Sequence, residues 1–143
     1  MNDISIDLWQ QRRDWIDQEL EAAEVGVHDT CDHAVALFFD MAISYCAGAW
    51  ISVIVMSVSV IDAHLRGAEA IDDKIGTAKL LNDYYTGSNI NWLRKLRNSY
   101  VHFDTDNPAL GMNAHFEDQT KMEEEATTAM KMTIKALFQN PGC

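Results

Sequence analysis

A long uncharged segment near the middle of the chain limits the folds that this sequence can adopt. The 21 residues from Met41 to Ile61 include no Asp, Glu, Lys or Arg, although the whole chain has 22 acidic and 11 basic residues. A segment of this kind either crosses a bilayer or lies at the centre of a core. Its flanks are Asp40 and Asp62, with no Lys or Arg anchor before Arg66, and four serines and Gly48 lower its hydrophobicity. We therefore expect a buried core helix and no membrane contact.

The composition favours one domain that spans residues 1–143. Hydrophobic residues make up 48% of the sequence, which is enough for a chain of this length to bury a core. Only two prolines occur, and no Gly/Ser-rich linker or internal repeat divides the chain. No segment sustains the alternation of apolar and polar residues that marks a strand. These patterns predict an all-α fold.

Apolar residues at helical spacing predict a bundle of five or six helices. The first helix is expected over residues 5–24. The second starts near Asp29 or Thr30 and bends around residues 46–48, where the third begins and continues to Arg66. The remaining helices are expected from Asp72 or Asp73 to Tyr85, from Ser88 or Asn89 to Phe103, and from Phe116 to Phe138.

Cysteine usage and the N-terminus indicate a cytoplasmic protein. The three cysteines, Cys31, Cys46 and Cys143, are odd in number and share no spacing typical of metal ligands. We therefore expect neither a disulfide framework nor a zinc site. The N-terminus carries Asp3 and Asp7 where a secretory signal would have basic residues.

The segment from His28 to His33 is a second cluster of side chains that can bind metals. It contains two His, one Cys and two Asp. Their spacing matches no standard zinc pattern, and helix capping by Asp29 or Thr30 explains the segment more simply. The chain also has no glycine loop that would cradle a phosphate. We expect no metal and no cofactor.

The motif that is most informative about function lies in the expected helix that ends at Phe103. Arg97 and Asn98 precede His102 by five and four residues. Arginine offers phosphate a planar cation with a forked set of donors, and histidine moves protons near neutral pH. These are the side chains that an RNA phosphodiester site needs. On an ideal helix Arg97 and His102 point about 140° apart, so either the helix ends near His102 or a second subunit completes the site.

This motif resembles the signature of the HEPN family (higher eukaryotes and prokaryotes nucleotide-binding), small all-α proteins in which Arg, often followed by Asn, stands a few residues before His. Residues 48–66 resemble the family's second core helix, with Asp62 where Glu is more usual. Asp104 stands where some HEPN toxins carry Tyr, so regulation through that Tyr is not implied. The resemblance covers residues 30–138, and residues 1–25 would form an additional N-terminal helix.

The resemblance implies metal-independent RNA cleavage by a homodimer that brings two Arg/His sets to a shared cleft. His102 would assist proton transfer at the 2′-hydroxyl, and Arg97 would stabilise the anionic phosphate. Asn98 would orient the phosphate or the histidine, and Asp62 could hold Arg97 through a bidentate pair. Such a protein would be a toxin or a phage-defence component, restrained by an antitoxin protein.

The distribution of charge leaves room for a small RNA footprint. The net charge of −11 repels polyanions unless positive charge is concentrated somewhere. Residues 66–97 hold six bases and four acids, whereas the rest of the chain holds five bases and eighteen acids. The basic residues beside the motif that we expect to contact RNA are Arg66, Arg94 and Lys95.

Two functions of different class remain open at this point. The first is the HEPN-type endoribonuclease. The second is a non-catalytic HEPN-like dimerisation or interaction module, in which Arg97, His102 and Asp62 only tie helices or subunits together. In either case the acidic run Glu123–Glu125 is expected to be a solvated face.

Overall fold

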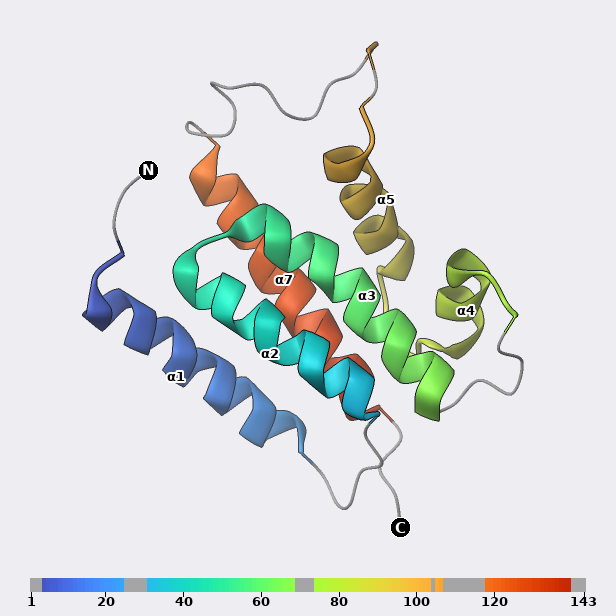
Figure 1. Cartoon of the computed structure of the whole chain (residues 1–143), viewed down its shortest axis with the longest axis horizontal. Helices are drawn as coiled ribbons and strands as arrows, with labels where there is room; N and C mark the ends of the chain where they lie inside the picture. The colour runs from blue at the N-terminus through green and yellow to red at the C-terminus, as the bar shows by residue number, and fades with distance from the viewer. Residues whose placement is uncertain (1–3, 25–30, 69–73, 104, 107–117, 140–143) are drawn as a thin grey trace.

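Six helices and no strand make up the residues that the computed structural model describes, which are 4–24, 31–68, 74–103, 105–106 and 118–139. The all-α bundle predicted from the sequence is confirmed over this part of the chain (Figure 1). The helices are α1 (Ile6–Ala23), α2 (Asp32–Ala47), α3 (Trp50–Ala68), α4 (Thr77–Tyr84), α5 (Ile90–Val101) and α7 (Gln119–Leu137).

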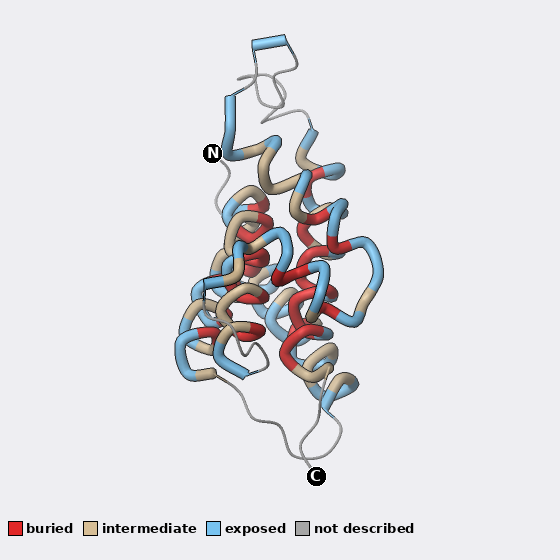
Figure 2. Tube along the Cα trace, turned by 90° about the vertical axis from the view of Figure 1, so that its right-hand side faces the viewer, coloured by how far each residue is buried: buried red, intermediate tan, exposed pale blue. Residues whose placement is uncertain are grey.

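Helix α3 lies at the centre of the bundle and is the core helix that the uncharged segment predicts. It packs against α2, α4, α5 and α7 (Figure 1). Its buried side chains follow the helical repeat, from Trp50 through Ile54 and Ile61 to Leu65. Figure 2 shows the buried residues gathered on the inner sides of the helices. Within the described residues, α3 is also the one helix whose length and composition would allow it to cross a membrane.

Two buried hydroxyl groups in the core find acceptors within their own helices. Ser57 Oγ donates to the Ile54 carbonyl of α3 at 2.6 Å, and Thr133 Oγ1 donates to the Ala129 carbonyl of α7 at 2.8 Å. A buried hydroxyl without an acceptor would cost about 1–3 kcal/mol. These bonds make a serine in the uncharged segment compatible with a fully buried position.

The turn between α2 and α3 depends on Gly48 and Arg12. Gly48 ends α2 with a φ of 74°, a left-handed conformation that glycine adopts without steric strain. Arg12 of α1 reaches this turn: its Nη1 donates to the Cys46 carbonyl at 3.1 Å, and its guanidinium lies 4.7 Å from the centroid of the Trp50 ring. The cation therefore meets both the negative end of α2 and an aromatic face. The bend predicted around residues 46–48 is confirmed.

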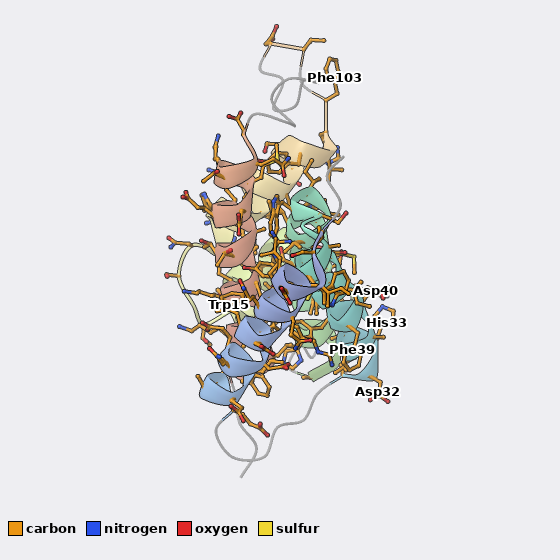
Figure 3. The ribbon with its side chains drawn as sticks, turned by 90° about the vertical axis from the view of Figure 1, so that its left-hand side faces the viewer. Trp15, Asp32, His33, Phe39, Asp40 and Phe103 are labelled. Carbon is orange, nitrogen blue, oxygen red and sulfur yellow. The ribbon has the colours of Figure 1, made fainter. Side chains whose placement is uncertain are left out.

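Helix α1 covers α2 and α7. The Trp15 ring stacks on Tyr45 with centroids 5.2 Å apart, and Tyr45 meets Trp50 edge-on at 5.3 Å. Figure 3 views the molecule from the α1 side, with Trp15 labelled. Thr127 of α7 donates its hydroxyl proton to the Glu123 carbonyl, so the Tyr45 hydroxyl is the donor in its 3.0 Å contact with Thr127. Burial raises the pKa of Tyr45, which keeps this donor protonated.

The end of α5 departs from its prediction, and the predicted starts of three helices, including that of α2 at Asp29 or Thr30, lie outside the described residues. Helix α4 is described from Thr77, and the predicted start at Asp72 or Asp73 lies outside the described residues. Helix α7 is described from Gln119, and its predicted start at Phe116 also lies outside them. Helix α5 ends at Val101, two residues before the predicted end, because the backbone becomes extended at His102.

Candidate functional site

Helix α5 carries the Arg-Asn-His motif and packs on α3 through one apolar side. Ile90 and Leu93 are buried, and Leu96 and Tyr100 are partly buried against the core. This spacing places the four side chains on one side of the helix. The apolar pattern of the sequence predicts Leu93, Leu96 and Tyr100 on this side together with Phe103, but Phe103 is 81% exposed because the helix ends before it. Asn89 precedes the helix with a φ of 66°, a conformation that Asn tolerates better than most residues, and its side chain makes no capping hydrogen bond.

The opposite side of α5 is polar and positively charged. Arg94 and Asn98 are half-buried, and Lys95 is exposed. At about 100° per residue, these three side chains lie within roughly 100° of one another around the helix axis. The helix has three basic residues and no acidic one, counting Arg97. It is the only described helix in which bases outnumber acids, in a chain of net charge −11.

His102 lies at the point where α5 ends. Its backbone is extended, with φ −101° and ψ 128°, and its N–H donates to the Asn98 carbonyl at 2.9 Å. Because the helix stops at Val101, the helical repeat no longer sets the direction of the imidazole. A helix end near His102, one of the two arrangements derived from the sequence, is therefore observed, and it is compatible with a site that a second subunit completes. The imidazole is exposed to solvent there.

Arg97 lies on the side of α5 that faces the core, since at about 100° per residue it falls between Ile90 and Leu93. The residue is half-buried, and its Nε is buried without a hydrogen-bond partner among the described residues. The two ion pairs found within these residues join Asp62 with Arg66 and Lys79 with Asp83, so neither involves Arg97. A buried donor left unpaired costs about 1–3 kcal/mol. The guanidinium charge of Arg97 is therefore not compensated by any described carboxylate.

Asp62 has partners other than the expected one, which corrects the predicted pair with Arg97. One carboxylate oxygen accepts from Arg66 Nε at 2.9 Å, and the other accepts from the hydroxyl of Thr77 at 2.9 Å. Arg66 lies one turn along α3 from Asp62, where a helical ion pair forms readily. Thr77 begins α4, so its bond ties α4 to α3. Sequence spacing could reveal the Arg66 pair but gives no signal for the Thr77 contact.

Tyr100 anchors the end of α5 to α7. Its hydroxyl donates to Glu125 Oε1 at 2.5 Å. Burial raises the pKa of Tyr100, and the hydrogen bond to Glu125 and the negative charge of that carboxylate raise it further. Glu125 is half-buried, so the predicted solvated face describes Glu123 and Glu124 but is wrong for Glu125. The sequence places Tyr100 in the apolar stripe without revealing this bond.

Two surface hollows in the described part of the chain lie away from α5. One, of about 400 Å³, is lined mainly by α1 and α7, and another follows the acidic outer side of α1. Residues 28–30 of the cluster with metal-binding side chains lie outside the described residues. Among those described, no three His, Cys, Asp or Glu side chains are grouped so as to hold a metal ion.

Comparisons of this chain with models of protein families, with curated proteins and with solved structures found no match. The functional proposal therefore rests on the residues of α5 and on the side chains that contact them.

Proposed function

We propose that this chain is a HEPN-type, metal-independent endoribonuclease that acts as a homodimer, with a composite site formed by Arg97 and His102 at a cleft between subunits. One observation carries the proposal: the motif lies on the only described helix in which bases outnumber acids. RNA approaches an acidic protein favourably only where positive charge is concentrated. Helix α5 meets that condition and exposes an imidazole at its end.

RNA supplies the nucleophile of the proposed reaction. The 2′-hydroxyl attacks the adjacent phosphorus, the bond to the 5′-oxygen breaks, and the products are a 2′,3′-cyclic phosphate and a 5′-hydroxyl. His102 removes the 2′-hydroxyl proton, and a water molecule protonates the leaving 5′-oxygen. Arg97 stabilises the phosphorus centre, which gains negative charge in the transition state.

Neighbouring residues on α5 position the substrate. Asn98 lies one turn before His102 on the polar side, where its amide can orient the phosphate or the imidazole. Arg94 and Lys95 extend the positive surface and contact the phosphates on either side of the cleaved bond. Arg66 contributes less than the sequence suggests, because its charge is paired with Asp62.

A homodimer is proposed because large apolar side chains of α2 lie at the surface. Phe39 is 63% exposed and Ile43 is 56% exposed, one helical turn apart. Figure 3 shows Phe39 on the outer side of α2, near the labelled His33 and Asp40. A second copy that packs on this pair would remove it from water. The proposal also includes an antitoxin protein that restrains the enzyme. The proposed location is the cytoplasm, where RNA is present and thiols such as that of Cys46 stay free.

The second candidate is a non-catalytic HEPN-like dimerisation or interaction module. Specific contacts favour it: Asp62 ties α3 to α4 through Thr77, and Tyr100 ties α5 to α7 through Glu125. In this case α5 only holds the neighbouring helices together. Arg97 and His102 then perform no reaction.

RNA cleavage in the presence of EDTA separates the two functions. Purified wild-type protein, Arg97→Ala and His102→Ala are incubated with structured and unstructured RNA, and molar mass is measured by light scattering on the same samples. The ribonuclease proposal predicts cleavage by a wild-type dimer and none by either variant, although both variants remain folded and dimeric. His33→Ala, which removes an exposed imidazole from α2, is the matched control and should cleave normally. An inactive wild-type dimer would favour the interaction module.

A further inference from the structure

Phe103 is a large apolar side chain that directly follows His102, and it is 81% exposed. Figure 3 shows its ring standing clear of the helices, beyond the end of α5. A phenylalanine in this position forgoes the favourable free energy of burying its ring. A ligand that covers the ring would recover that free energy.

A second aromatic side chain lies on the exposed side of the same helix. Trp92, in the first turn of α5, is 38% exposed. At about 100° per residue, Trp92 lies within roughly 60° of the exposed residues Lys95 and Ser99 around the helix axis. An exposed track therefore runs along α5 from Trp92 past Lys95 and Ser99, and the exposed residues His102 and Phe103 continue it beyond the end of the helix. Aromatic rings lie at both of its ends, with a cation between them.

The chemistry of this track fits a polyanion with unpaired planar rings. Lys95 places a positive charge on the track, and Arg94 and Arg97 add two more elsewhere on α5, which has no acidic residue; this favours an anionic ligand. Acids also lie near its end: Glu125 accepts the hydrogen bond of Tyr100, Asp118 stands at the N-cap of α7 without a side-chain capping bond, and Asp104 and Asp106 follow Phe103 in the sequence. Single-stranded nucleic acid combines phosphates with exposed rings that stack on aromatic side chains.

We infer that Phe103 is a stacking platform for a nucleobase of single-stranded RNA, with Trp92 as a second platform at the far end of the track. The inference rests on the proposed ribonuclease function and names its substrate class, an unpaired strand. Duplex RNA holds its bases in stacked pairs, where these rings cannot reach them. His102 and Phe103 are consecutive, so a base on Phe103 belongs to a nucleotide beside the phosphate at His102. Every base has a flat face, so the contact selects single strands without selecting a sequence.

An RNA that cannot be cleaved tests this contact separately from catalysis. The probe is a single strand of about ten nucleotides, methylated at every 2′-oxygen and carrying one 2-aminopurine, whose fluorescence falls on stacking. We expect the wild-type protein to quench and bind the probe. Phe103→Ala should weaken binding by about fivefold to about a hundredfold. Phe103→Trp should retain binding, whereas Phe103→Leu, which keeps apolar volume without a ring, should behave like Phe103→Ala.

Val101→Ala is the matched control, because it removes an exposed apolar side chain from the same end of α5 and should leave binding unchanged. The inference is overturned if the wild type does not bind the probe, if Phe103→Ala binds equally well, or if annealing the probe to its complement leaves binding undiminished. Conversion of a wild-type dimer to a monomer by Phe103→Ala would also overturn it, since the ring would then belong to a protein interface. Binding through Phe103 without cleavage of an unmodified strand would support the stacking site and contradict the ribonuclease proposal. Cleavage of an unmodified strand, with binding that does not depend on Phe103, would support the ribonuclease proposal and contradict the stacking site.

Discussion

The hydroxyl of Tyr100 donates a hydrogen bond to Glu125 and so joins α5 to α7 two residues before His102. The raised pKa of Tyr100 keeps this hydroxyl protonated and able to donate at neutral pH. The bond fixes the end of the helix that carries the imidazole, while the polar side of that helix remains open to solvent.

Removal of the Tyr100 hydroxyl should destabilise the fold. Tyr100→Phe deletes the donor and leaves the half-buried Glu125 carboxylate without it, so we expect the free energy of unfolding to fall by about 1–2 kcal/mol. Urea unfolding followed by circular dichroism measures the change. Tyr84→Phe is the control, because no hydrogen bond of the Tyr84 hydroxyl is found within the described residues. It should change stability by less than about 0.5 kcal/mol. Equal stability of Tyr100→Phe and wild type would contradict the account of this contact.

Stability should decrease at alkaline pH because tyrosines are buried. Burial raises the pKa of Tyr85 to about 12, compared with about 10 in an unfolded chain. The folded state therefore holds the Tyr85 proton more tightly, so its contribution is complete below about pH 10 and is lost as the pH rises from there towards 12. The slope for this one group is at most about 1.4 kcal/mol per pH unit. The pKa values of Tyr45 and Tyr100 are shifted in the same direction.

Urea unfolding at about pH 8 and about pH 11 tests this dependence. Tyr85→Phe cannot ionise at position 85, so it should lose less stability between the two pH values than the wild type does. The same loss in both proteins would show that ionisation of Tyr85 is not linked to unfolding.

Arg12 should matter for stability more than its place on an outer helix suggests. Arg12→Ala removes the bond to the Cys46 carbonyl and the contact with the Trp50 ring, and we expect a loss of about 1–3 kcal/mol. Arg13→Ala removes an exposed arginine from the neighbouring position and should be close to neutral. Thermal unfolding of the two variants at equal ionic strength makes the comparison. Equal effects of the two substitutions would contradict the role given to Arg12.

The exposed pair on α2 should control self-association. Phe39→Ser combined with Ile43→Ser replaces the apolar surface with polar groups at positions that make little contact within the subunit. We expect a dimer in the wild type and a folded monomer in the double variant, measured by light scattering over a range of concentrations. Ile6→Ser, at an isoleucine of α1 that is 86% exposed, is the control and should remain dimeric. A monomeric wild type would show that this interface does not exist. A double variant that remains dimeric would show that the interface lies elsewhere.

The positions of the helices could be predicted from the sequence because apolar side chains such as Leu93 and Ile61 recur with the helical period and are the ones that become buried. Gly48 marked the turn between α2 and α3 for a local reason, since a left-handed residue ends a helix. The spacing of Arg12 from Trp9 and Ile16 likewise predicts that Arg12 lies on the inner side of α1. Its target could not be predicted, because the Cys46 carbonyl and the Trp50 ring come together only after α2 and α3 have packed.

Partner choice in the candidate site was the part that sequence reasoning could not determine. Asp62 was expected to bind Arg97, but Arg66 is nearer along the same helix and Thr77 approaches from α4. Such a choice depends on how α4 and α5 lie against α3, which the spacing of residues does not encode. The end of α5 before His102 could not be predicted either, because no glycine or proline marks the point where the backbone becomes extended.

Complementation between two inactive variants tests the composite ribonuclease site most directly. Arg97→Ala and His102→Ala are each expected to be inactive; mixed and allowed to exchange subunits, they form hybrid dimers. If each site takes its arginine from one subunit and its histidine from the other, half of the dimers are hybrids with one intact site, and about one quarter of wild-type RNA cleavage in EDTA should return. Recovery of that activity is the result we predict. No cleavage by the mixture, under conditions where the wild type cleaves and exchange is demonstrated, would contradict a site shared between subunits.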